Sequence, residues 1–203
     1  MLVARRMGSS QANGPGNRAV VWFQGCDIRC PGCCNPELQP LDSVMAVSSS
    51  PTELAVWFHD QLCKYHDLRG ITLSGGEPLH PRQRADVSSF LDICRRKAPR
   101  PFDVMAFTGY TSLDLINEFG LALDDLPDID LFIAGPYDET RRNASGIVSS
   151  TNQEILRCSP AFDDVDDHTL LLGSRIVEVR MADGIVTVTG LSSIDESLEM
   201  LGM

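Results

Sequence analysis

Three cysteines stand close together in the stretch Gly25-Cys26-Asp27-Ile28-Arg29-Cys30-Pro31-Gly32-Cys33. The spacing Cys-x3-Cys-x2-Cys lets one short loop direct three thiolates at a single soft metal centre. A structural zinc site needs four ligands, usually as two separated pairs, and a cubane iron–sulfur cluster is normally held by four cysteines. Three ligands from one loop, without an evident fourth, therefore indicate a cluster with one iron left open for another molecule.

The remaining cysteines leave some alternatives open. Cys34 directly follows the third presumed ligand, and we favour a packing thiol there over a redox or substrate-contacting role. Counting alone also allows a four-cysteine zinc site, although two adjacent cysteines rarely ligate one zinc. Cys63, Cys94 and Cys158 are isolated from one another, so a second cluster is not expected. Cys63 and Cys94 are predicted to be small buried hydrophobic residues.

A second motif, Ser74-Gly75-Gly76-Glu77-Pro78, follows the short predicted strand over residues 71–73. A glycine pair at the end of a strand breaks the strand pattern. Because glycine carries no Cβ, the backbone there can come close to a ligand. The motif is therefore a candidate binding turn.

Taken together and in this order, about forty residues apart, the cysteine loop and the glycine turn resemble the radical S-adenosylmethionine (radical SAM) superfamily. Within it they are most similar to the small glycyl-radical activating enzymes, the group that activates anaerobic ribonucleotide reductase. The resemblance implies that Cys26, Cys30 and Cys33 hold a [4Fe-4S] cluster whose open iron is chelated by the amine and carboxylate of SAM. It further implies that the reduced cluster cleaves SAM to a 5′-deoxyadenosyl radical, which abstracts a hydrogen atom.

The same resemblance assigns further residues to the SAM pocket. The turn from Ser74 to Pro78 would contact the methionyl part of SAM, although Glu77 is equally able to brace the backbone. Asn35-Pro36-Glu37, Thr108-Gly109-Tyr110-Thr111 and residues 149–153 also match the group's pattern. The predicted cofactor-binding residues are Gly32, Cys34, Ser74, Gly75, Gly76, Glu77, Pro78, Thr108, Ser150 and Asn152, with Gln153 as a further pocket residue.

One position departs from the group. Ala134 precedes Gly135-Pro136 where the group often has an aspartate, so an acid at this place would have to come from Asp138 or Glu139. Three functions follow, in order of preference. The first is hydrogen abstraction from a glycine of a partner glycyl-radical enzyme, with a flavodoxin- or ferredoxin-like electron donor. The second is a radical SAM enzyme for a small molecule or a peptide natural product. The third is an iron–sulfur or zinc binding module without SAM chemistry.

The elements needed to position these residues follow from apolar patterning. Predicted strands over residues 19–24, 71–73, 102–107 and 129–134 alternate with helices that begin near Pro51, Pro81 and Ser112. This alternation predicts an α/β fold of βα units with a parallel sheet. A complete ring of eight strands needs about 250 residues, so we expect a partial, incomplete βα barrel of the radical SAM type. The candidate site would lie at the C-terminal ends of its strands.

We expect a single radical SAM domain over residues 1–203, with a core over about 19–157. Residues 1–18 are expected to form a loop that leads into the core; the Gly14-Pro15-Gly16 segment either is flexible or lies over the active site. Residues 158–203 form an extension, in which the acidic run 163–167 is expected to be a solvated loop. Residues 176–180 and 185–189 alternate around Ala182-Asp183-Gly184 and predict a β-hairpin that serves as a lid or docking element.

Composition limits the remaining possibilities. Of 203 residues, 43% are hydrophobic and 22% charged, which is ordinary for a globular domain. The formal net charge of −11 argues against non-specific nucleic-acid binding. We find no apolar run of the roughly 18–20 residues that a membrane span needs, and no signal-peptide core. Crowded cysteines do not resemble a secreted disulfide framework. A cytoplasmic protein without nucleic-acid or membrane partners is expected.

Overall fold

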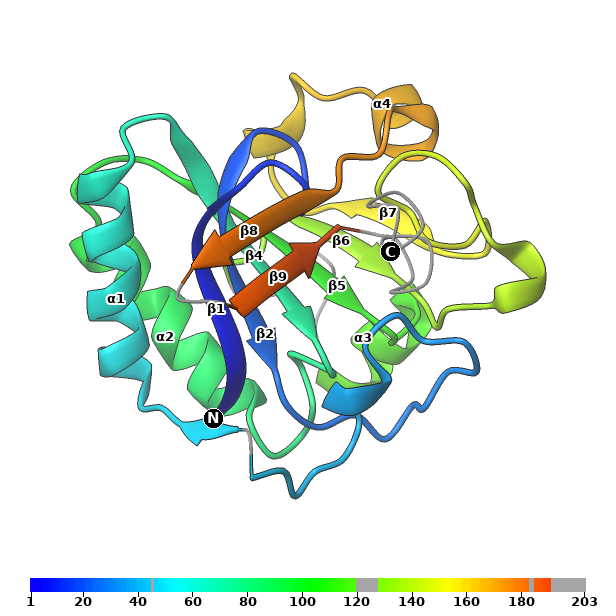
Figure 1. The fold of residues 1–203 in the computed structure, drawn as a ribbon, viewed down its shortest axis with the longest axis horizontal. Coiled ribbons are helices and arrows are strands. Elements are labelled where there is room, and N and C mark those ends of the chain that lie inside the picture. The colour runs from blue at the N-terminus through cyan, green and yellow to red at the C-terminus, as the bar shows by residue number, and fades with distance from the viewer. Residues whose placement is uncertain (45, 120–127, 183–184, 191–203) are drawn as a thin grey trace.

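The computed structural model describes residues 1–44, 46–119, 128–182 and 185–190. Its centre is a seven-stranded sheet with the strand order β3-β1-β2-β4-β5-β6-β7 (Figure 1). Neighbouring parallel strands form the middle of this sheet: β2 (Asn17–Phe23), β4 (Leu68–Gly75), β5 (Asp103–Thr108) and β6 (Leu131–Ala134). Their mostly apolar residues are buried on both faces, as is usual for parallel strands. The predicted α/β fold with a parallel core is confirmed, and the complete sheet is mixed.

The N-terminal segment is a strand, so the prediction of a loop over residues 1–18 is wrong. β1 (Leu2–Ser10) pairs antiparallel with β2, and its register shifts twice, between Val3 and Arg5 and between Met7 and Ser10. These bulges break the alternation of buried and exposed residues, which is the signal by which a strand is predicted. Pairing with β2 stabilises a stretch whose own sequence pattern is weak.

The Gly14-Pro15-Gly16 turn joins β1 to β2 at the N-terminal end of β2. The cysteine loop leaves β2 from its other end, after Phe23. The interpretation that this turn lies over the active site is therefore wrong. Two further antiparallel pairings complete the sheet: β3 (Val47–Ser48) with β1, and β7 (Glu154–Arg157) with β6.

Three helices pack their apolar residues into one core with the sheet. α1 (Pro51–Lys64) begins with the predicted capping box, in which the Ser50 hydroxyl accepts the Glu53 N–H at 3.2 Å and Glu53 accepts the Ser50 N–H at 2.8 Å. α2 (Arg84–Lys97) begins after a turn over residues 81–83, later than the predicted start at Pro81. α3 (Ser112–Phe119) has its predicted bounds.

The isolated cysteines of α1 and α2 differ in burial. Cys94 is buried in the core between the helices and the sheet, as predicted. Cys63 is exposed, so its predicted burial is wrong. It lies beside the buried Leu62 but faces solvent together with Lys64, and neighbouring helix positions face different directions.

A second apolar cluster joins β5 and β6 to the C-terminal part of the chain through Phe162, Val165 and Leu170. The acidic side chains of residues 163–167 are exposed as predicted, but the run also starts α4 (Asp167–Leu172). Asp166 caps this helix, its carboxylate accepting the Thr169 N–H at 2.6 Å. Short 3₁₀ helices span Pro36–Leu38, Glu139–Arg141 and Pro160–Phe162.

The predicted hairpin is confirmed as β8 (Glu178–Ala182) paired antiparallel with β9 (Ile185–Thr189); its turn, Asp183-Gly184, lies outside the described residues. The hairpin rests on the loop that joins β1 to β2. Glu178 accepts a hydrogen bond from the Ser10 hydroxyl, and the Asn13 amide donates to the Thr189 hydroxyl at 3.0 Å. Among the described helices, none is long and apolar enough to cross a bilayer.

Candidate functional site

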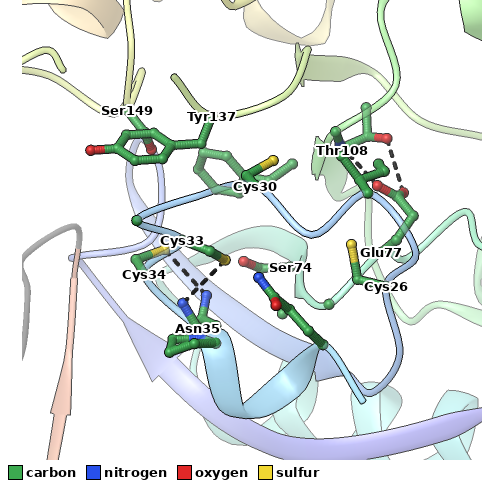
Figure 2. Close-up of a pocket in the computed structure, with 18 of the residues that line it drawn as sticks. Cys26, Cys30, Cys33, Cys34, Asn35, Ser74, Glu77, Thr108, Tyr137 and Ser149 are labelled. Atoms are coloured by element: carbon green, nitrogen blue, oxygen red, sulfur yellow. Dashed lines mark hydrogen bonds between the residues drawn. The ribbon is translucent and has the colours of Figure 1, made fainter. Parts of the chain in front are cut away.

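A cavity of about 370 Å³ opens at the C-terminal ends of the parallel strands (Figure 2). β2 leads into the cysteine loop, β4 ends in the glycine turn, and β5 ends at Thr108. The two sequence motifs are thus brought to one edge of the sheet, as their positions after strands predict. Sequence-predicted residues in the cavity wall are Cys26, Cys30, Gly32, Cys33, Cys34, Ser74, Gly75, Gly76, Glu77, Thr108 and Gln153.

The thiols of Cys26, Cys30 and Cys33 surround this cavity and are partly buried (Figure 2). None of the cysteines in the described structure forms a disulfide. Burial raises the pKa of Cys26, and it raises the pKa of Cys30 against a hydrogen bond from the Tyr137 backbone. A single loop therefore supplies three free sulfur donors to one space.

Cys34 is distinguished from Cys33 by its hydrogen bonds. The Asn35 N–H donates to the Cys33 sulfur at 3.4 Å, and the Asn35 side-chain amide donates to the Cys34 sulfur at 3.3 Å. A hydrogen bond from the Cys34 thiol lowers the pKa of Cys33 to about 6, whereas the same bond raises the pKa of Cys34. No three histidine, cysteine or acidic side chains of the described residues are arranged to hold one metal ion, which counts against the zinc alternative.

The glycine turn packs directly beneath the cysteine loop. A Cβ on Gly75 would lie 2.5 Å from the Phe23 nitrogen, and one on Gly76 would lie 2.5 Å from the Gly25 oxygen. Two backbone hydrogen bonds of 2.8 Å join the segments, from Gly76 N–H to Phe23 O and from Glu77 N–H to Gly25 O. The glycines border the cavity as predicted, but the closest approach that they allow is between two backbones of this chain.

Glu77 braces the neighbouring turn. Its carboxylate is only 1% exposed and accepts from Leu79 N–H at 2.9 Å, the Thr108 hydroxyl at 2.9 Å and Gly109 N–H at 2.8 Å. Burial raises the pKa of Glu77 to about 7, while the hydrogen bonds oppose that rise. Of the two predicted roles for Glu77, the structure therefore shows the bracing one, and Thr108 is fixed by the same bond.

Three predicted cofactor-binding residues lie outside the cavity wall. Pro78 is buried behind the turn. The Ser150 hydroxyl accepts the Asp138 N–H at 3.1 Å, and the Asn152 amide donates to the Pro136 carbonyl at 2.8 Å. Their loop instead presents Ser149 and Gln153 to the cavity.

Several residues of the cavity wall were not predicted as cofactor contacts: Ile28, Phe107, Tyr137, Glu139, Arg142 and Arg175. Of the two acids considered for the place of Ala134, Glu139 borders the cavity, whereas the Asp138 carboxylate accepts from Thr140 N–H at 3.0 Å and caps a 3₁₀ helix. Glu139 could have been chosen by its position after Gly135-Pro136. Arg175 carries no such signal, because only the fold returns the C-terminal extension to this edge.

Comparison with known proteins agrees with this geometry. Residues 12–156 match the family described as "4Fe-4S single cluster domain". The chain belongs to this family, in the group of the glycyl-radical activating proteins, which confirms the predicted resemblance. The relatives include the anaerobic ribonucleoside-triphosphate reductase-activating protein of Pasteurella multocida, 31% identical over 152 residues that cover 71% of this chain and 90% of the relative. The proteins of that name from Escherichia coli K12 and phage T4 are each 29% identical; they match over 149 residues (71% of this chain, 90% of the relative) and 144 residues (70% and 85%).

Proposed function

We propose that this protein is a radical SAM enzyme in which Cys26, Cys30 and Cys33 hold a [4Fe-4S] cluster with one iron open to SAM. The observation that carries the proposal is the meeting of three thiols from one loop with the glycine turn of β4 at a single cavity. A volume of about 370 Å³ falls within the range of about 300–1,000 Å³ that is usual for cofactor sites. When bound, the reduced cluster would supply the electron that cleaves SAM to a hydrogen-abstracting 5′-deoxyadenosyl radical.

The chain's own residues would bind and orient the cofactors. Gly75 and Gly76 keep the turn close to the cysteine loop, and Glu77 holds the end of β5 in register with that turn. Ile28 and Phe107 give the cavity apolar walls that exclude water. A SAM contact of Asn152 remains a prediction; among the described residues its buried Oδ1 has no hydrogen-bond partner, which would suit a ligand donor.

We extend the proposal to the architecture. The parallel strands would form the partial βα barrel of the radical SAM type, with its site at the strands' C-terminal ends. Residues 1–203 would form one domain, with the hairpin β8–β9 as an extension held on the loop after β1.

For the substrate, we propose a glycine of a partner glycyl-radical enzyme such as anaerobic ribonucleotide reductase, since the relatives are named as activators of that reductase. A flavodoxin- or ferredoxin-like protein would supply the electron. One observation favours a second candidate, a small molecule or peptide natural product: Ala134 replaces the acid that is usual in the group, and Glu139 borders the cavity instead.

Anaerobic reconstitution followed by electron paramagnetic resonance (EPR) tests these proposals. We expect about four irons per chain, their loss in Cys26→Ala, Cys30→Ala or Cys33→Ala, and their retention in Cys34→Ala. SAM should change the spectrum of the reduced cluster. A glycyl-radical doublet after addition of the reductase supports the first substrate, whereas deoxyadenosine without a doublet supports the second. A colourless protein, or loss of the cluster in Cys34→Ala, would refute the ligand assignment.

A further inference from the structure

His80 connects the glycine turn to the cysteine loop through its side chain. Its Nε2 lies 2.9 Å from the Oδ2 of Asp27, the residue after Cys26. Its Nδ1 accepts the Arg82 N–H at 3.2 Å. Because a neutral imidazole has one donor and one acceptor nitrogen, this bond makes Nδ1 the acceptor and leaves the hydrogen on Nε2, which donates to the Asp27 carboxylate.

The two ends of this contact differ in their surroundings. The His80 side chain is only 6% exposed, and its backbone is fixed by bonds from His80 N–H to Glu77 O at 3.1 Å and from Gln83 N–H to His80 O at 2.9 Å. The Asp27 side chain is 64% exposed on the outside of the cysteine loop. A rigid donor therefore holds an exposed carboxylate that follows a presumed cluster ligand.

The loop itself has backbone conformations that need such support. Arg29 has a φ of 52° and Gly32 a φ of 70°, and the left-handed region is unfavourable for a residue such as arginine. The backbone bond from Cys26 N–H to Gln39 O, 2.9 Å long, holds the start of the loop, and the Cys33 N–H bonds within the loop, to Cys30 O. Asp27 is where a side chain ties the first half of the loop to the turn of β4.

We propose that Asp27 and His80 are a pair of positioning residues that fix the cysteine loop against the glycine turn, so that cluster ligands and cofactor turn keep one geometry. This inference rests on the proposed function. Neither residue is assigned a chemical step. In cluster sites, residues that hydrogen-bond to the ligand shell orient the ligands and tune the metal, which is the role assigned here to the pair.

Two substitutions of His80 separate the contact from the bulk of the ring. The side-chain amide of His80→Gln can reach the Nε2 position and keep a donor for Asp27, whereas His80→Asn reaches only the Nδ1 position. Asp27→Ala removes the other end at an exposed position, where the fold does not depend on it. His59→Asn is the matched control, because His59 is an exposed histidine 3.8 Å from Asp60 on α1.

The reconstituted full-length proteins would be compared anaerobically by the rate of iron release to a chelator and by the EPR spectrum of the reduced cluster with SAM. We expect His80→Asn and Asp27→Ala each to release iron about fivefold faster, since one charge-assisted hydrogen bond is lost at a partly exposed site. His80→Gln and His59→Asn should stay within about twofold of the wild type. The double variant, Asp27→Ala with His80→Asn, should be no faster than the faster single variant, because both remove one contact.

Wild-type release rates and spectra in Asp27→Ala would overturn the inference, as would single effects that multiply in the double variant. If His80→Asn unfolds, the comparison of Asp27→Ala with His80→Gln still decides, because only the first loses the bond. A wild-type protein that binds no cluster would instead refute the proposed function and the inference with it.

Discussion

Gly76→Ala would show whether the glycine turn exists for the close approach of two backbones. The new Cβ would lie 2.5 Å from the Gly25 oxygen and 2.8 Å from the Leu38 oxygen. Both are backbone atoms, which cannot rotate away as a side chain can. Gly76 has no positive φ, so alanine at this position meets a steric obstacle and no conformational one.

The cost follows from the distances. Contacts of a Cβ below 3.0 Å essentially never occur, so the turn and the loop must separate by at least 0.5 Å, the difference between 3.0 and 2.5 Å. That movement strains the two 2.8 Å bonds to Phe23 O and Gly25 O. About 1 kcal/mol for each bond and about 1–3 kcal/mol for overpacking give a loss of about 3–5 kcal/mol. For a chain of this size the melting temperature should fall by about 10 °C.

Thermal unfolding of the cluster-free protein, followed by circular dichroism, measures this loss without the cofactor. Gly109→Ala is the control, because its Cβ would meet the tip of the Ile28 side chain at 2.5 Å, and that side chain can rotate. We expect the control to lose no more than about 1 kcal/mol. A Gly76→Ala protein that melts within about 3 °C of the wild type, or a control that loses as much, would show that close backbone approach is not what Gly76 provides.

Buried ionisable groups give three more expected outcomes. Since burial raises the pKa of Glu77 from 4.5 to about 7, its stabilising contribution is complete below pH 4.5 and is lost as the pH rises through 7. The wild type should lose about 3 kcal/mol of unfolding free energy over that range in urea titrations, and parallel curves for Glu77→Gln would contradict this. Asp103→Asn leaves the fully buried Arg18 without the carboxylate 2.6 Å away and should cost about 3–5 kcal/mol; a loss below about 1 kcal/mol would refute the pairing. Peptide mapping of maleimide-treated apoprotein should show the exposed Cys63 modified about a hundredfold faster than Cys94, whose pKa burial raises to about 12; equal rates would disprove that burial.

The central strands and the first helix were predictable because their signals are local. β2 is buried along nearly its whole length, so its apolar run indicates a parallel strand without knowledge of its neighbours. The capping box at Ser50 likewise specifies the start of α1 from residues three apart. The cysteine loop and the glycine turn follow such strands, and parallel strands bring their C-terminal ends together. Those facts were enough to predict that the motifs share one edge.

Other features depend on contacts that are distant in sequence. β1 owes its strand conformation to pairing with β2, because two bulges disturb its own pattern. The loop over residues 149–153 presents Ser149 and Gln153 to the cavity, whereas Ser150 and Asn152 bond to Asp138 and Pro136. A family pattern identifies such a loop, but its irregular backbone decides which side chains point inward. Arg175 reaches the cavity only because the C-terminal extension folds back.

The two ends of the parallel strands are built for different tasks. At the N-terminal end, Arg18 is fully buried and pairs with Asp103, which also accepts from Arg69 at 2.5 Å; this network fixes the sheet with permanent charges. At the C-terminal end, the fully buried ionisable group of the motifs is Glu77, and its pKa near 7 lets it be neutral there. Charges fixed deep under the cavity would act on any charged group bound above them. An edge built from glycines, thiols and one neutralisable carboxyl instead leaves the charge of the site to the cofactors proposed to bind there.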